Sequence, residues 1–144
     1  MSTLLLFLPP RTRLRALGRT APAAEASRTE APREYDWALT PDGRQISEQG
    51  RAAPARLPAA DSVVAVVAES DVSWRRVELP RAGRQMRAAL AGKLEDVVLD
   101  DAEALHFAVE PDAVGGDTAW VAISSRAGLA EHLAELEAAQ VFVD

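Results

Sequence analysis

The stretch that decides the fold is Val72–Ala138, VSWRRVELPRAGRQMRAALAGKLEDVVLDDAEALHFAVEPDAVGGDTAWVAISSRAGLAEHLAELEA. Its first residues, Val72–Leu79, have the alternating pattern of a strand. Pro80 follows, and proline suits the first turn of a helix. Apolar residues then recur at helical spacing, at Met86, Leu90, Leu94 and Val97. The segment therefore begins as a strand followed by an amphipathic helix.

The second half of this stretch predicts two more strands and a second helix. Residues 105–109 and 119–123 have strand-like patterns, with a Gly115-Gly116 turn between them. Ser125 can cap the helix that follows. The expected core positions of that helix are Leu129, Leu133 and Leu136. We expect both helices to cover a sheet formed by these strands.

The first half of the chain predicts further strands. Thr3–Leu8 reads as a buried strand, and Glu34–Thr40 reads as a second strand that alternates Tyr, Trp and Leu on one face. The turn signal Pro41-Asp42-Gly43 lets Arg44–Gln49 return as a hairpin partner. Ser62–Ala68 is a nearly unbroken apolar run, which is typical of a central strand covered on both faces. Val141–Val143 has the pattern of a strand that begins as the sequence closes.

Two linkers separate these strands. Residues 11–33 and 50–60 are rich in Ala, Arg and Pro and lack apolar periodicity, so we expect flexible, exposed loops there. The chain then divides into strands of a first part, residues 1–71, and a small α/β subdomain, residues 72–144. The predicted fold class is α/β, with a mixed sheet.

Composition and charge exclude several classes of protein. Residues 1–60 carry nine Arg and six acidic residues, a balance of +3, and residues 61–144 carry seven basic and sixteen acidic residues, a balance of −9; the two sum to the net charge of −6. The acidic second half argues against nucleic acid as a partner, because phosphates require clustered Lys and Arg. The chain has no cysteine, which excludes disulfides and thiolate zinc sites. No run approaches the ~20 apolar residues of a membrane helix.

The residues that could carry chemistry form no catalytic or metal-binding pattern. His106 and His132, the only histidines, lack the HxH or HExxH spacing of metal sites, and we interpret them as structural or surface residues. The acidic cluster between the first helix and the next strand has no turn glycine among its ligands, so a solvated turn is favoured over a Ca²⁺ or Mg²⁺ site. This cluster comprises Glu95, Asp96, Asp100, Asp101 and Glu103.

Other motifs also favour structural roles. Ser124 and Ser125 lack a GxSxG elbow, and the glycine-rich turn Val114–Asp117 opens no helix and carries no Lys for a phosphate. Arg75-Arg76 reads as a solvated pair on a strand. The tryptophans at 37, 74 and 120 occupy strand positions where packing is favoured, although an aromatic residue near a sheet edge can anchor a partner. We therefore predict no catalytic, cofactor-binding or metal-binding residue, and leave the partner-binding residues open.

Four runs, ELP at 78–80, RAAL at 87–90, DDAEALHFAV at 100–109 and AWVAISSRAGLAEHL at 119–133, resemble the cytoplasmic domain of type II secretion system protein L. The resemblance also covers residues 4–8, 35–40 and 62–143. It implies a partial actin-like, ribonuclease-H-like fold: the first lobe with an inserted small α/β subdomain. It further implies an N-terminal fragment or truncated product, without the second lobe, membrane helix or periplasmic domain.

The resemblance implies a non-catalytic scaffold on the cytoplasmic side of the bacterial inner membrane. Its expected partners are the N-terminal domain of the secretion ATPase (protein E), inner-membrane protein M and platform protein F, with a homodimer in the full-length form. The alternative is an actin-like nucleotide-binding protein or ATPase. Nucleotide-binding members carry an Asp and glycines after the first strand, where this chain has Pro9-Pro10, which offer no carboxylate and no amide donors. We therefore expect neither enzyme activity nor a cofactor.

Overall fold

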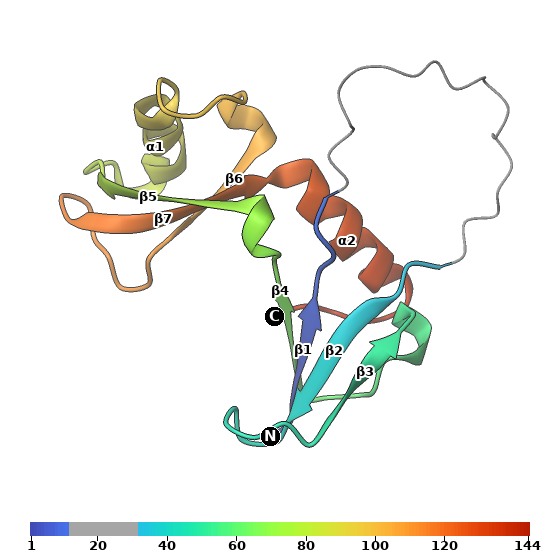
Figure 1. Ribbon diagram of the computed structural model, residues 1–144. Coiled ribbons are helices and arrows are strands. Elements are labelled where there is room, and N and C mark those ends of the chain that lie inside the picture. The colour runs from blue at the N-terminus through green and yellow to red at the C-terminus, as the bar shows by residue number, and fades with distance from the viewer. Residues whose placement is uncertain (12–31) are drawn as a thin grey trace, which may run out of the picture. The chain divides into compact units, whose positions relative to one another are not determined.

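The computed structural model describes residues 1–11 and 32–144 (Figure 1). It divides into two compact units: Met1–Val66 together with Glu135–Asp144, and Val67–Ala134. The sequence predicts a second part that begins at residue 72 and includes residues 135–144. In the structure, Glu135–Asp144 group with the first unit. The predicted loop at residues 11–33 lies almost wholly outside the described residues.

The first unit contains a four-stranded sheet in the order β3-β2-β1-β4. Its central strand, β1, is antiparallel to β2 and parallel to β4. Alternate residues of β1, Leu4 and Leu6, are completely buried, as expected of a strand whose one face lies against a core. The strands are β1 (Thr3–Phe7), β2 (Tyr35–Thr40), β3 (Glu48–Ala52) and β4 (Ser62–Val66).

The hairpin partner of β2 begins later than predicted, and this overturns part of the predicted loop at residues 50–60. Residues 50–52 are paired with β2, and the 3-10 turn Pro54–Arg56 buries Pro54. The connection is longer because the carboxylate of Asp42 accepts the backbone N–H groups of Arg44 and Gln45, at 2.8 and 2.9 Å. These bonds hold a wide turn and delay the return of the chain.

Strand β4 is an edge strand, and the prediction of a central strand covered on both faces is wrong. Its residues are half-buried or exposed. The outer edge of β4 is instead bonded to Asp144, whose N–H donates to the carbonyl of Val63 (3.0 Å) and whose carboxylate accepts the hydroxyl of Ser62 (2.6 Å) and the N–H of Val63 (2.9 Å). Residues 141–143, for which the sequence predicts a strand, do not form one.

The second unit is a three-stranded antiparallel sheet, in the order β5-β7-β6, with one helix on one face. Its elements are β5 (Val72–Glu78), α1 (Met86–Leu94), β6 (Leu105–Val109) and β7 (Thr118–Ser125). All four were predicted from the sequence. The buried cluster joins the helix to the sheet and consists of Leu79, Leu90, Leu94, Leu105, Ala119, Val121 and Ile123.

Two details of the helices differ from the prediction. Helix α1 ends at Leu94, so Val97 falls outside it and is 52% exposed, while Val98 packs against the core instead. Helix α2 (Arg126–Ala138) contributes no residue to the buried cluster of the three-stranded sheet, so the prediction that both helices cover that sheet is wrong.

Helix α2 extends from the second unit into the first. As predicted, Ser125 caps it: the Ser125 hydroxyl accepts the N–H of Gly128 at 3.3 Å. Of the predicted core positions, Leu136 is completely buried, while Leu129 and Leu133 are only half-buried.

Candidate functional site

The two histidines do not meet in a metal site. His106 is exposed on β6, opposite Ser124 of β7, while His132 is buried on α2. Within residues 1–11 and 32–144, no three His, Cys, Asp or Glu side chains gather where they could share a metal ion.

The acidic segment after α1 forms a solvated turn. The carbonyl of Asp101 accepts the N–H of Ala104 at 2.9 Å and begins a 3-10 turn, Ala102–Ala104, and the Asp101 side chain makes no cap bond. Asp100, Asp101 and Glu103 are exposed. The carboxylates therefore face water, where they supply negative charge to the surface of this unit.

The glycine-rich turn 114–117 closes against the β5–α1 connection. The N–H of Gly116 donates to the carbonyl of Leu79 (2.9 Å), and the N–H of Leu79 donates to the carbonyl of Asp117 (2.7 Å). A Cβ at Gly115 would lie 2.9 Å from the carbonyl oxygen of Pro80, which leaves room only for glycine. The turn therefore has a structural role, because its backbone groups form hydrogen bonds with other residues of the chain.

The end of β1 continues the sheet instead of opening a phosphate loop. The N–H of Leu8 donates to the carbonyl of Val66 at 2.9 Å, which extends the parallel pairing beyond Phe7. Pro9 and Pro10 follow, and neither has an N–H to offer a phosphate.

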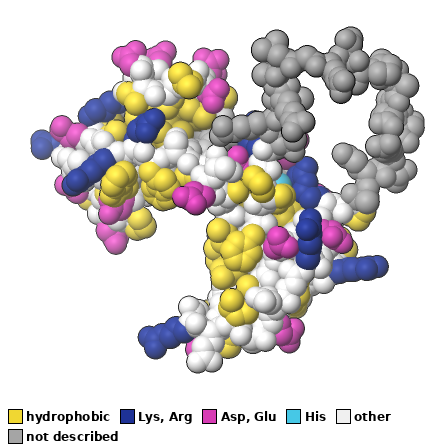
Figure 2. Space-filling model, viewed as in Figure 1, with side chains coloured by type: hydrophobic (Ala, Val, Ile, Leu, Met, Phe, Trp, Pro, Cys, Tyr) yellow, Lys and Arg dark blue, Asp and Glu magenta, His cyan; other side chains and the backbone are white. Residues whose placement is uncertain are grey.

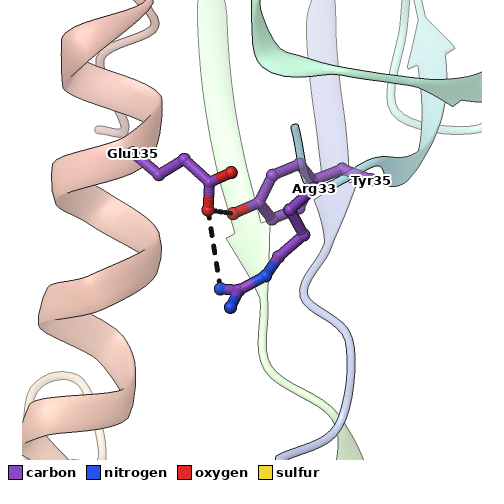
Figure 3. Close-up of polar contacts among 3 residues, drawn as sticks. All are labelled: Arg33, Tyr35 and Glu135. Carbon is purple, nitrogen blue, oxygen red and sulfur yellow. Dashed lines mark hydrogen bonds and ion pairs between the residues drawn. The ribbon is translucent and has the colours of Figure 1, made fainter. Parts of the chain in front are cut away.

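A buried phenol in the first unit has a strongly perturbed pKa. The Tyr35 hydroxyl donates to the Glu135 carboxylate at 3.0 Å, and the Arg33 guanidinium lies 3.5 Å from the same oxygen. Figure 3 shows Glu135 reaching from α2 toward both side chains. Burial, with the carboxylate beside it, raises the pKa of Tyr35 to about 12. The phenol stays protonated near neutral pH and acts as a hydrogen-bond donor that fixes α2 to β2.

A hollow of about 600 Å³ lies beside this cluster and is bordered by Glu34, Arg51, Pro54 and Glu135, among others. The charges on its rim are opposed in pairs: the Arg51 guanidinium lies 3.4 Å from the Glu34 carboxylate. The rim therefore presents no concentrated charge to a ligand. Its walls are mostly proline and alanine, with the carboxylates of Glu34 and Glu135 at the rim.

Two exposed tryptophans form an apolar feature on the second unit. Trp74 of β5 and Trp120 of β7 are 59% and 47% exposed, which overturns the expectation that they pack inside. With Glu110 and Pro111 they border a shallow hollow of about 440 Å³. Figure 2 shows hydrophobic side chains exposed over β5 and β7, with charged side chains around them. Large exposed aromatic residues of this kind are typical of protein-docking surfaces.

The third tryptophan behaves as predicted. Trp37 of β2 is half-buried, and its ring covers Gly50, its cross-strand neighbour on β3. A Cβ at Gly50 would lie 3.1 Å from the ring. Trp37 therefore packs within the sheet, in contrast to Trp74 and Trp120.

Residues 33–144 match the model of the family described as type II secretion system (T2SS), protein L. The chain belongs to the type II secretion system protein L family. A solved structure also matches the whole chain, with a TM-score of 0.66 and 24% identity: Cyto-EpsL, the cytoplasmic domain of EpsL, an inner membrane component of the type II secretion system of Vibrio cholerae. This chain covers 56% of that one. No curated protein matches the sequence.

The likeness to Cyto-EpsL confirms the predicted fold class, a mixed α/β fold. It concerns the fold alone, because identity is low. The chain is thus a protein L component of the type II secretion system, a protein-transport machinery. Within the described residues, neither helix has the length and apolar character needed to cross a bilayer.

Sequence reasoning missed the exposed face around Trp74 and Trp120, and the contact between Tyr35 and Glu135. The alternation of β5 did separate Trp74 from the core residues, and this signal could have placed it on the open face. No sequence pattern joins Tyr35 to Glu135, because they are 100 positions apart. That contact depends on the tertiary fold.

Proposed function

We propose that this chain is a non-catalytic scaffold of the type II secretion inner-membrane platform. In this role it docks the N-terminal domain of the cytoplasmic secretion ATPase, protein E, and links it to inner-membrane protein M and platform protein F. It would act on the cytoplasmic side of the inner membrane. Membership of the protein L family over residues 33–144 is the observation that carries this proposal.

The physical character of the chain supports a binding role over catalysis. The described residues that could do chemistry are either solvated, as in the acidic turn at 100–103, or occupied in packing, as with Tyr35. The sequence balance of −9 from residue 61 onward supplies a negative surface, which would attract a partner with a basic face. Such an association weakens as salt screens the charges.

The alternative function is that of an actin-like nucleotide binder. Pro9-Pro10 argue against it, because the proline pair stands where a phosphate loop would place amides. The two functions differ in the ligand that the chain binds: the domain of the secretion ATPase in the first and a nucleotide in the second.

Calorimetry with two ligands tests the proposal. The chain is titrated with ATP in the presence of Mg²⁺, and separately with the purified N-terminal domain of the cognate secretion ATPase. We expect heat of binding from the ATPase domain only, and a weaker affinity when the salt concentration rises. Binding of ATP without binding of the ATPase domain would reverse the assignment.

A further inference from the structure

Two tryptophans and one carboxylate border the same hollow on the second unit. Trp74 of β5, Trp120 of β7, Glu110 and Pro111 line a volume of about 440 Å³. This volume falls within the range of roughly 300–1,000 Å³ that ligand pockets span. An exposed indole forgoes the free energy of burial, so two of them beside one hollow indicate a surface that is covered when a ligand binds.

The strand register places both indoles on the same face of the sheet. Trp74 pairs with Ala122 of β7, which lies two residues beyond Trp120. The two tryptophans are therefore diagonal neighbours, about 7–8 Å apart and within reach of each other's long side chains. The opposite face carries Val121 and Ile123, which belong to the buried cluster under α1. Both rings can thus contact one ligand that approaches the open face.

The carboxylate of Glu110 is held at the edge of this hollow by the backbone of Trp120. The N–H of Glu110 donates to the Trp120 carbonyl at 2.9 Å, and the Glu110 carboxylate accepts the Trp120 N–H at 3.1 Å. A carboxylate has about four acceptor positions on its two oxygens. One bond to Trp120 therefore fixes the group and leaves acceptor positions for a ligand.

The charge around the hollow favours a cation. The second unit, Val67–Ala134, carries twelve acidic and seven basic residues, a balance of −5. Arg76 pairs with Trp120 on the side away from Glu110, which places the two charged residues about 10 Å apart at the usual strand spacing. In the part of the chain that the structure describes, no ion pair joins Arg76 to Glu110. The carboxylate is therefore available to a cationic ligand.

We propose that this hollow binds an arginine side chain in an extended segment of a partner protein. A guanidinium is planar, so it stacks on an indole while its N–H groups donate to a carboxylate. Trp74 and Trp120 supply the aromatic faces, and Glu110 supplies the acceptor. Lysine fits less well, because its ammonium is compact, strongly hydrated and unable to stack.

The proposed function assigns no residue of the chain to a partner, and the arginine site goes beyond it. The site is defined by the chemistry of the bound segment and not by the protein that supplies it. A single side chain in a shallow hollow gives weak binding, with a dissociation constant on the order of 1 mM. A synthetic peptide tests it, so failure of this proposal and failure of ATPase docking give separate results.

The test is an NMR titration of the whole chain with a short blocked peptide that has one central arginine among glycines and serines. The chain has three tryptophans and thus three indole N–H signals, which single Trp→Leu variants assign. We expect the signals of Trp74 and Trp120 to shift, while that of Trp37, in the first unit, stays in place. The same peptide with citrulline, the uncharged counterpart of arginine, should bind at least about tenfold more weakly, because it lacks the charge that both contacts require.

Variants of the chain separate the carboxylate from the net charge. Glu110→Gln should raise the dissociation constant of the arginine peptide at least about fivefold, because a charge-assisted hydrogen bond is lost. Glu103→Gln is the matched control: it makes the same change at an exposed position before the other end of β6, and should change binding less than about twofold. Trp74→Leu keeps an apolar side chain without an aromatic face and should weaken binding about threefold. The amide spectrum shows that each variant is folded.

Four results would overturn the proposal. One is the absence of indole shifts at peptide concentrations up to about 10 mM, ten times the expected dissociation constant. Another is equal binding of the arginine and citrulline peptides. A third is an equal effect of Glu110→Gln and Glu103→Gln, which would mean that the peptide responds only to net charge. The last is tighter binding of a proline-rich peptide without arginine, which would assign the hollow to a polyproline segment.

Discussion

Tyr35 is the only tyrosine of the chain, so absorbance of the phenolate reports its ionisation directly. Burial and the hydrogen bond to Glu135 raise the pKa of Tyr35 to about 12, from an ordinary value of 10.0. Between these values only the unfolded chain releases the proton, so the folded state loses stability as the pH rises through this window. We expect a phenolate midpoint near 12 in the folded chain.

The control for this titration is Glu137, which lies on α2 like Glu135, the hydrogen-bond partner of Tyr35. Glu135→Gln removes the negative charge beside the phenol and should lower the midpoint toward 10, whereas Glu137→Gln, an exposed position two residues on, should leave it unchanged. A midpoint near 10 in the folded wild type would show that Tyr35 is not buried against Glu135.

Two glycines give opposite expectations for the same substitution. At Gly50 an added Cβ would lie 3.1 Å from the ring of Trp37, so Gly50→Ala should lower the free energy of unfolding by about 1 kcal/mol. At Gly92, inside α1, an added Cβ would meet no atom within 4 Å. Gly92→Ala should therefore raise the free energy of unfolding by about 0.5–1 kcal/mol, because alanine has the higher helix propensity. Urea denaturation measures the change in the free energy of unfolding for each variant. Two changes in the same direction would contradict this account.

At the scale of elements, the sequence predicted where strands and helices form better than it predicted how they pair and pack. The strands β2, β5 and β6 followed from alternation, because alternate side chains of a strand face opposite sides of its sheet, while β1 followed from an apolar run and β7 from the turn before it. The position of β4 did not follow, since an apolar run is typical of a buried strand and does not reveal that an edge is bonded by a distant residue, here Asp144. Pairing is a tertiary property.

The second helix shows the same limit. Its spacing correctly placed Leu136 in a core but gave equal weight to Leu133, which is half-buried. Leu136→Ala should therefore cost about 2–5 kcal/mol of unfolding free energy, and Leu133→Ala clearly less. Urea denaturation of both variants decides the helix phase: an equal or larger loss for Leu133→Ala would mean that this residue, and not Leu136, faces the core.

The exposed face around Trp74 and Trp120 was predictable only in part, for a related reason. Alternation assigns Trp74 and Arg76 to one side of β5, but placing Arg76, Trp120 and Glu110 in one row requires the strand register. Register is fixed by the core contacts of all three strands together. The sequence therefore indicated the residue types of the face and not their arrangement.

At the scale of the whole molecule, α2 belongs to both units: its residues up to Ala134 group with the second unit, and those from Glu135 group with the first. A helix of only the first nine residues, 126–134, would be marginally stable in water. Anchoring of the helix end by Leu136 and Glu135 in the first unit should therefore stabilise the part that lies in the second.

Hydrogen exchange tests this coupling. Leu136→Ala loosens the anchored end, so we expect faster exchange of backbone amides along α2, including residues 130–134, while the amides paired between β5 and β7 keep their protection. The matched variant is Leu90→Ala, which removes a buried residue of the second unit and should instead expose the β5–β7 amides. If the effect of Leu136→Ala stops at residue 135, the two parts of α2 open separately.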